Sequence, residues 1–294
     1  MFKEFVEERI EGDGATLFVR RAGPAGAPPL VLLHGYPQTS AMWHGVAPIL
    51  ARSYQIICPD LRGYGRSDKP VSNASHEPYS KRAMANDIVA VMRRLGHKRF
   101  LVGAHDRGAR VAHRMGLDHP DCVAAMTLLD IAPTREMYAN TSVEFARAYW
   151  HWFFLIRPTP LPETLIETDP ENYLRTVMGT RSAGMGPFTD DAFSEYLRCL
   201  KLPGAAIAIC EDYRASAGLD LEHDQADIDA GNKLKCPLLA LWGEKGTVGR
   251  CFSPLHEWQK VALNVDGKAL ASGHYIAEEI PELLLEYTLD FLKQ

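Results

Sequence analysis

The chain opens with short apolar runs that are separated by longer amphipathic stretches. The runs at 28–35, 54–60, 99–104 and 124–130 are rich in apolar residues, which is typical of strands buried on both faces of a sheet. A further strand is expected early in the chain, at 16–23. The pattern therefore predicts a sheet built mainly from the first half of the protein.

Two of the connecting segments have helical spacing. Residues 80–96 predict a helix with Ser80 as its N-cap and Gly96 as its stop. Residues 106–120 predict a second helix, which Pro120 ends. Strands that alternate with helices in this way predict an α/β fold with a mostly parallel sheet and helices on both faces.

The alternation stops after residue 131 and returns near residue 232. Between them lie helical, aromatic and proline-broken segments such as "EFARAYWHWFFL" and "DDAFSEYLRCL". Strands are expected again at 236–243 and 260–265, before a final helix at 278–292. The expected organisation is one α/β domain interrupted by a helical cap, with segments 1–131, 132–231 and 232–294.

Composition narrows the class of protein. With 46% hydrophobic and 23% charged residues, the 294-residue chain is expected to fold into a packed globular protein. The net charge is -5 and no long basic run occurs, so nucleic acid is not an expected partner. The N-terminus lacks the apolar segment of a signal peptide, and no apolar run is long enough to span a membrane. We therefore expect a cytoplasmic protein without a membrane partner. Six scattered cysteines form no CxxC pair, which favours buried, reduced thiols over a metal or redox site.

Candidate chemistry is concentrated in "GAHDRGAR", which follows the predicted strand at 99–104. A sharp strand-to-helix turn that presents a nucleophile needs small residues two positions before and after it, and Ala104 and Gly108 meet that need. The nucleophile position holds Asp106. The alternative is that Asp106 is only the N-cap of the following helix.

Two arginines in the first turn of that helix argue for an anionic ligand. The helix dipole disfavours Arg107 and Arg110 there by a few tenths to about 1 kcal/mol each. They stand three positions apart and therefore share a face, where a bound anion would stabilise both. Each could instead reach solvent or an acidic neighbour. Arg114 continues the same stripe and is expected at the surface.

A carboxylate nucleophile forms an ester that water must then hydrolyse, and a histidine with an acidic partner can activate that water. His274 lies in a glycine-containing loop before the last helix, where such a histidine is expected. Asp130 ends a predicted strand and is favoured as its acidic partner over Glu244, which follows the next strand. The backbone N–H groups of Tyr36 and Arg107 are the candidate oxyanion-hole donors.

These motifs together resemble the α/β-hydrolase superfamily over nearly the whole chain. "HGYPQT", "PDLRGYGRSDKP", "GAHDRGAR" and "ASGHYIAEE" occur in the expected order. Haloalkane dehalogenases and epoxide hydrolases carry tryptophan directly after the aspartate nucleophile, whereas this chain has Arg107. "HDRGAR" resembles the fluoroacetate dehalogenases, whose paired arginines bind the substrate carboxylate. The resemblance implies that Arg107 and Arg110 do the same here.

The resemblance also implies a halide site made of His151, Trp152 and Tyr213. Imidazole, indole and phenol each supply one hydrogen-bond donor, which suits a small and strongly hydrated leaving group. By the residues alone, "YWHWFF" favours a buried aromatic stripe over a halide site. Consecutive residues of a regular helix do not share a face, so His151 and Trp152 can act together only around a small ion or at an irregularity.

The expected function is hydrolytic dehalogenation of a short 2-haloacid, with fluoroacetate as the favoured substrate and no metal or organic cofactor. The alternatives are an epoxide hydrolase, a dehalogenase limited to C–Cl and C–Br bonds, and a non-catalytic receptor on the same scaffold. The family further implies a homodimer.

Overall fold

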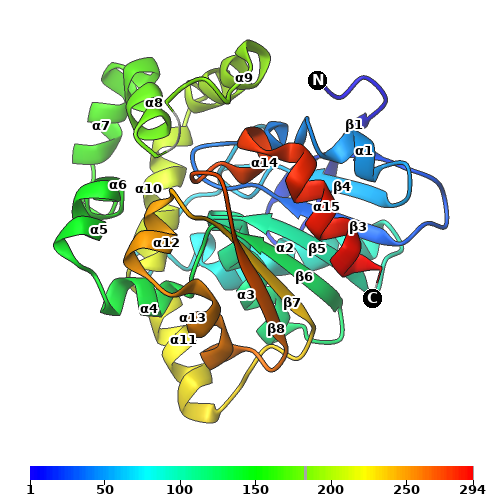
Figure 1. Cartoon of the computed structure of the whole chain (residues 1–294). Coiled ribbons are helices and arrows are strands. Elements are labelled where there is room, and N and C mark those ends of the chain that lie inside the picture. The colour runs from blue at the N-terminus through cyan, green and yellow to red at the C-terminus, as the bar shows by residue number, and fades with distance from the viewer. Residues whose placement is uncertain (182–183, 294) are drawn as a thin grey trace.

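A computed structural model describes residues 1–181 and 184–293. Its centre is an eight-stranded sheet in the order β1-β2-β4-β3-β5-β6-β7-β8 (Figure 1). The first two pairings, β1 with β2 and β2 with β4, are antiparallel, and all later ones are parallel. The strands are β1 Val6–Glu11, β2 Thr16–Ala22, β3 Pro29–Leu33, β4 Gln55–Pro59, β5 Phe100–His105, β6 Val123–Leu129, β7 Leu238–Gly243 and β8 Val265–Leu270.

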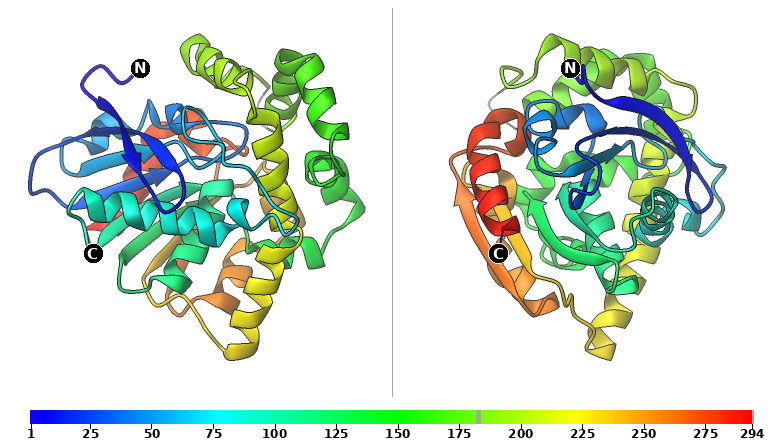
Figure 2. Two further views of the ribbon diagram at one scale, coloured as in Figure 1. Left: turned by 180° about the vertical axis from the view of Figure 1, so that it is seen from behind. Right: turned by 90° about the vertical axis from the view of Figure 1, so that its right-hand side faces the viewer.

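Helices lie on both faces of the sheet, as the sequence predicts. In the side view of Figure 2, the red C-terminal helix and the cyan helix α2 lie on opposite sides of the strands. The helices that accompany the sheet are α1 Ala47–Leu50, α2 Lys81–Arg94, α3 Arg107–Asp118, α12 Thr247–Cys251, α13 Pro254–Val261, α14 Ile276–Glu279 and α15 Pro281–Leu292, with short 3-10 turns at Ser40–Trp43 and Glu77–Tyr79.

The predicted helix signals at 80–96 are confirmed. The Ser80 side chain accepts a hydrogen bond from the backbone N–H of Ala83, as an N-cap does. Gly96 has a φ of +88°, a left-handed conformation that glycine adopts without strain and that ends the helix.

Two strand predictions need correction. Strand β1 was not expected, because five of its six residues are at least partly exposed and four are charged, so it shows no buried face. The strand expected at 260–265 is wrong: those residues end α13 and form the turn after it, and β8 begins only at Val265. β8 is an edge strand whose alternate residues are exposed, so Asp266 and Lys268 replace the apolar run expected of a buried strand.

Between β6 and β7 the chain forms helices that lie together at one side of the sheet (Figure 1). We call residues 134–230 the helical segment; the division of the protein into core and cap at residues 132 and 231 stays a prediction. Its helices are α4 Thr134–Ala139, α5 Val143–Ala148, α6 Trp150–Leu155, α7 Leu161–Thr168, α8 Pro170–Gly179, α9 Asp190–Leu200, α10 Ala205–Ser216 and α11 Leu219–Ala230.

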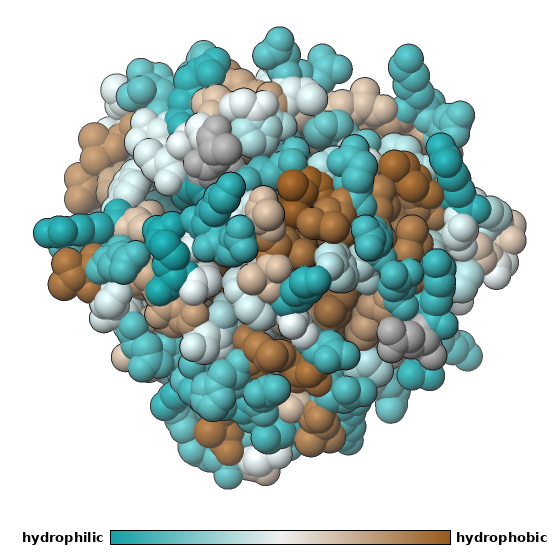
Figure 3. Space-filling view, viewed as in Figure 1, coloured by the Kyte–Doolittle hydropathy of each residue, from teal (hydrophilic) through white to brown (hydrophobic). Residues whose placement is uncertain are grey.

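The surface seen in Figure 3 is mainly hydrophilic, and its apolar side chains form separate small groups. Among the described residues, no helix combines the length and the apolar character needed to cross a membrane. Five of the six cysteines are buried and all six are free thiols.

Candidate active site

Asp106 occupies the turn between β5 and α3 in a strained conformation. Its φ of +44° and ψ of -110° lie outside the regions that non-glycine residues favour. The turn is tight, because a Cβ on Gly108 would lie 2.6 Å from the carbonyl oxygen of His34. The Asp106 side chain makes no capping hydrogen bond to α3, so the N-cap alternative is wrong. Asp106 is fully buried, and the turn directs its carboxylate into the protein.

His274 and Asp130 meet beside Asp106. The Nδ1 atom of His274 lies 2.6 Å from Oδ2 of Asp130, and its Nε2 atom lies 3.7 Å from Oδ2 of Asp106. The backbone N–H of Gly243 donates to the other Asp130 oxygen at 2.9 Å and so orients that carboxylate. Glu244, the alternative acidic partner, has an exposed side chain. The structure therefore brings together Asp106, His274 and Asp130.

The loop that carries His274 is held by an acidic residue of α14. Glu279 accepts hydrogen bonds from the backbone N–H groups of Gly273 at 2.6 Å and of Tyr275 at 2.9 Å. These two residues flank His274, so the carboxylate restrains the peptide that carries the imidazole.

Several donors face the Asp106 carboxylate. The backbone N–H of Tyr36 lies 3.3 Å from Oδ2, and Nη2 of Arg181 lies 3.4 Å from the same atom. Burial raises the pKa of Asp106, but the neighbouring His274 and the charge of Arg181 outweigh burial and hold the pKa well below its usual value. Asp106 is therefore ionised at neutral pH, and one of its oxygens, Oδ1, has no hydrogen-bond partner in the described protein.

The two arginines of α3 have different surroundings. Arg107 donates from Nε at 2.9 Å and from Nη2 at 2.6 Å to the carboxylate of Asp212 on α10, and Nη2 also bonds the Ser216 hydroxyl. Lys81 pairs with the same carboxylate. The remaining nitrogen of Arg107, Nη1, is buried without a partner, and its guanidinium carbon lies 4.2 Å from the ring centre of Tyr213.

Arg110 has no carboxylate partner among the described residues. Its Nη1 donates to the Thr134 hydroxyl at 2.6 Å, its Nη2 lies 3.2 Å from the sulfur of Met137, and its Nε is buried without a partner. The guanidinium lies 4.7 Å from the ring centre of Trp152. Burial, and after it the charge of Arg107, lower the pKa of Arg110 to about 10. A buried cation without a paired anion is costly, which makes Arg110 a candidate for binding an anionic ligand.

The expectation for Arg114 is wrong. Its side chain is buried rather than at the surface, and it pairs with Asp118 at 2.9 Å and with Asp227 of α11 at 2.5 Å. The α11 helix covers this face of α3, which the helical spacing of the sequence does not reveal.

His151, Trp152 and Tyr213 are all buried, and each has a polar atom without a partner: Nε2, Nε1 and the phenol oxygen, respectively. The His151 and Tyr213 ring centres are 6.0 Å apart. Burial holds the pKa of His151 well below 6.5 and that of Tyr213 well above 10, so the imidazole is neutral and the phenol keeps its proton.

An irregularity precedes these residues in the chain. Helix α5 ends at Ala148, Tyr149 has a φ of -108° and a ψ of +38°, and α6 begins at Trp150. His151 and Trp152 both lie after this break, inside α6, so the break does not bring their side chains to one face of the helix.

Three residues beside the site were not found from the sequence. They are Arg181, which contacts Asp106; Tyr149, whose hydroxyl lies 3.3 Å from Nδ1 of His274; and Asp212, which pairs with Arg107. None belongs to a local motif, and Tyr149 and Arg181 lie 43 and 75 residues from Asp106 along the chain. Among the described residues, no cluster of histidine, cysteine or carboxylate side chains has the arrangement of a metal site.

Comparisons with known proteins identify the family of the chain. The family model described as "alpha/beta hydrolase fold" matches residues 28–203. The chain is 40% identical to a fluoroacetate dehalogenase of Burkholderia sp over 99% of this chain and 95% of the relative. It is 34% identical to a soluble epoxide hydrolase of Corynebacterium sp. (strain C12), over 90% of this chain and 89% of that protein.

A solved alpha/beta hydrolase from Nostoc sp PCC 7120 superposes with a TM-score of 0.96 and 49% identity, covering 99% of each chain. The family match spans more than half of the protein, and the relatives cover almost all of it. The chain therefore belongs to the alpha/beta hydrolase fold family.

Proposed function

We propose that the protein hydrolyses the carbon–halogen bond of a short 2-haloacid through an aspartyl-ester intermediate, with fluoroacetate as the favoured substrate. One observation carries the proposal: the buried, ionised Asp106 stands at the start of α3, and the same helix carries Arg110, a buried cation that lacks a carboxylate partner among the described residues. A nucleophilic carboxylate suits attack on saturated carbon, and the cation suits an anionic substrate. Similarity to a fluoroacetate dehalogenase supports the same reading.

In the first step, Nε of Arg110 and Nη1 of Arg107 bind the substrate carboxylate, because these are the unpaired donors of the two arginines. An Asp106 oxygen attacks the α-carbon in line with the halogen. A C–O bond forms, the C–halogen bond breaks, and the electron pair leaves with the halide. The two cations also reduce the repulsion between the nucleophile and the substrate carboxylate.

The leaving halide is stabilised by His151, Trp152 and Tyr213, each of which has an unpaired buried polar atom. Fluoride is formed inside the protein without the strong hydration shell that it has in water, so several donors are needed in place of that shell. The neutral imidazole of His151 places its proton on Nε2 in this role, and the indole and phenol donate directly.

In the second step, His274 takes a proton from water, and the water oxygen attacks the carboxyl carbon of Asp106. Asp130 holds Nδ1–H of His274, which leaves the lone pair on Nε2 for the water. The backbone N–H groups of Tyr36 and Arg107 stabilise the tetrahedral oxyanion. The ester bond then breaks, His274 returns the proton to the departing glycolate oxygen, and the Asp106 carboxylate is restored with the loss of one proton to solvent.

Epoxide hydrolysis is the second candidate, and specific observations favour testing it. The Corynebacterium relative is a soluble epoxide hydrolase, and the phenol groups of Tyr138 and Tyr213 are both buried without a partner. Two such phenols can donate to an epoxide oxygen. A neutral epoxide, however, leaves the charge of Arg110 uncompensated, which favours the haloacid.

The decisive experiment measures fluoride release from fluoroacetate with an ion-selective electrode, beside chloride release from chloroacetate and diol formation from styrene oxide. Asp106→Asn serves as the matched control, because it keeps the shape and removes the nucleophile. We expect halide release that the control abolishes. Diol formation without halide release from any haloacid would refute the proposal in favour of epoxide hydrolysis.

Three further expectations stay predictions: the boundaries of the cap at residues 132 and 231, a homodimeric state, and a cytoplasmic location. Light scattering of the purified protein tests the second. A mass of one chain, about 32.7 kDa, would contradict it.

A further inference from the structure

Arg181 occupies a position that the proposed reaction requires for water. It follows α8 in the helical segment, and only 2% of its side chain is exposed. Nη1 donates to the carbonyl oxygen of Tyr36 at 3.1 Å, and Nη2 lies 3.4 Å from Oδ2 of Asp106. Nη2 also contacts Nε2 of His274. The guanidinium therefore lies between the nucleophile and the imidazole.

The contact with His274 excludes water from the same place. A guanidinium has donors and no acceptor, so Nε2 of His274 must accept with its lone pair. Nδ1 then carries the proton toward Asp130, 2.6 Å away. The lone pair on Nε2 is the one that must take a proton from the hydrolytic water, so Arg181 and that water cannot occupy the position together.

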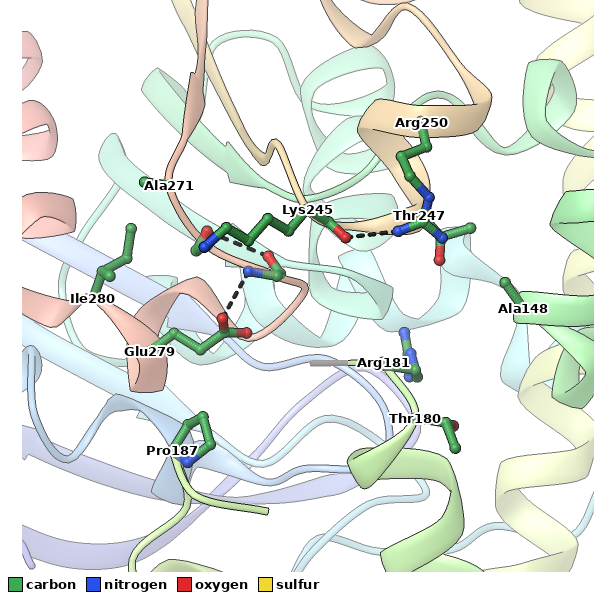
Figure 4. A pocket seen from close by; sticks show the side chains of 12 residues that line it. Ala148, Thr180, Arg181, Pro187, Lys245, Thr247, Arg250, Ala271, Glu279 and Ile280 are labelled. Atoms are coloured by element: carbon green, nitrogen blue, oxygen red, sulfur yellow. Dashed lines mark hydrogen bonds between the residues drawn. The ribbon is translucent and has the colours of Figure 1, made fainter. Parts of the chain in front are cut away.

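An outer cavity of about 420 Å³ lies on the other side of Arg181. In Figure 4, Arg181 lies below Lys245 and Arg250 and above Thr180, all of which line this cavity. Glu279 and the loop that leads to His274 complete the lining on the side of the sheet. Asp106, His274 and Asp130 are themselves exposed by 1% or less and do not line this cavity, whereas Arg181 lines it and also contacts Asp106 and His274.

The negative charge of Asp106 stabilises the buried position of the Arg181 guanidinium. Arg181 faces no other carboxylate among the salt bridges of the described residues. A buried cation without an anion costs far more than one in water, so loss of the Asp106 charge would leave Arg181 only its neutral partners, the Tyr36 carbonyl oxygen, His274 and the rings of Tyr149 and Tyr275. Its Nε is buried without a partner, which adds to the cost of the inner position.

We propose that Arg181 is a charge-controlled positioning residue, which holds the water site in the resting protein and leaves it for the outer cavity when Asp106 becomes an ester. The inference rests on the proposed function, because that reaction supplies the charge change. When the Asp106 oxygen bonds carbon, its negative charge leaves with the halide toward His151 and Tyr213. Among the described residues, Arg181 makes no hydrogen bond to either of these.

The consequence is an order of events. Before alkylation, water is kept away from His274 and the carboxylate stays ionised and oriented. After alkylation, the outward move of Arg181 admits water to Nε2 of His274 and the ester is hydrolysed. Hydrolysis restores the Asp106 charge, which draws Arg181 back.

The first test follows the exposure of Arg181 with phenylglyoxal, a reagent that modifies arginine side chains. His274→Ala protein is labelled with and without prior chloroacetate treatment, and the modified peptides are quantified by mass spectrometry. Loss of one charge-assisted hydrogen bond predicts about a 10-fold or greater rise in Arg181 labelling in the ester form. Arg175, an exposed residue of α8 paired with Glu171, is the internal control and keeps its labelling.

Equal labelling of Arg181 in both forms would overturn the inference. Absence of any mass increase on Asp106 would be a different result, because it refutes the aspartyl-ester reaction itself and the coupling with it. The intact mass is therefore measured in the same samples.

The second test separates the two chemical steps by rapid quenching. In Arg181→Met the ester should be hydrolysed at a rate within about threefold of the wild type or faster, because water no longer competes with a guanidinium. Arg175→Met is the matched control. Accumulation of the ester, with hydrolysis slowed more than about tenfold, would instead show that Arg181 assists the water and would overturn the inference.

Discussion

Arg107 has a buried carboxylate partner and Arg110 has none among the described residues, so their replacement by leucine should change the melting temperature differently. Burial lowers the pKa of Arg110 to about 10, which corresponds to a penalty of roughly 3 kcal/mol in the free energy of folding. The folded-state pKa lies below the unfolded value, so the penalty is fully present at pH 7 and disappears only as the pH rises above about 10 and past the unfolded-state pKa. Arg110→Leu removes that penalty together with the hydrogen bond to Thr134 and the contact with Trp152.

The two effects are similar in size, since a charge-assisted hydrogen bond contributes about 1.5–3 kcal/mol. Arg110→Leu should therefore melt within about 4 °C of the wild type or above it. Haloacid turnover should fall, with kcat/KM reduced about 10- to 100-fold or more, because a charged contact to the substrate carboxylate is lost.

Arg107→Leu should behave differently. It removes the main partner of the buried Asp212 carboxylate and leaves only Lys81 to compensate it. Breaking a buried ion pair costs about 3–5 kcal/mol, so the melting temperature should drop by roughly 6–15 °C.

Scanning calorimetry and haloacid kinetics on the two variants test the comparison. If Arg110→Leu unfolds as readily as Arg107→Leu while keeping its turnover, Arg110 is a structural residue and the argument for an anionic substrate fails.

Three further predictions concern the halide site, the His274 loop and a buried acid. Trp152→Phe removes a buried donor that has no partner, so it should slow fluoride release about 10-fold more than chloride release in parallel electrode assays. An equal slowing of fluoride and chloride release would show that Trp152 does not belong to the halide site. Glu279→Ala frees the two peptide N–H groups that flank His274, so single-turnover mass spectrometry should find ester hydrolysis slowed about 10-fold and ester formation much less affected. Burial raises the pKa of Glu278 to about 8, so the folded state binds the Glu278 proton more tightly than the unfolded state does. Ionisation of Glu278 should therefore lower the melting temperature as the pH rises from 4.5 to 8. Glu278→Gln should flatten that part of the pH profile, because the new amide stays neutral and can donate to the unpaired Oε1 of Gln38; an unchanged profile would contradict the argument.

Much of the fold follows from local pattern. Apolar runs predicted the parallel strands β3 to β7, because a strand buried on both faces has few polar positions. The edge strands β1 and β8 were missed or misplaced for the opposite reason, since each exposes alternate residues and carries charges. Helix α2 was predicted with its N-cap and its glycine stop because these signals lie within a few residues of each other.

The sequence by itself determined the residues that act along one loop or one turn. The tight turn around Asp106 needs small neighbours within two positions, and the order of Asp106, Asp130 and His274 follows the order of the strands that carry them. Only the tertiary structure decided what faces these residues across the fold. Asp212 neutralises Arg107 and not Arg110, and Arg181 reaches Asp106 from the helical segment, because helices more than 70 residues distant pack over the turn. Charge pairing across such distances depends on where whole elements dock, and no local spacing encodes it.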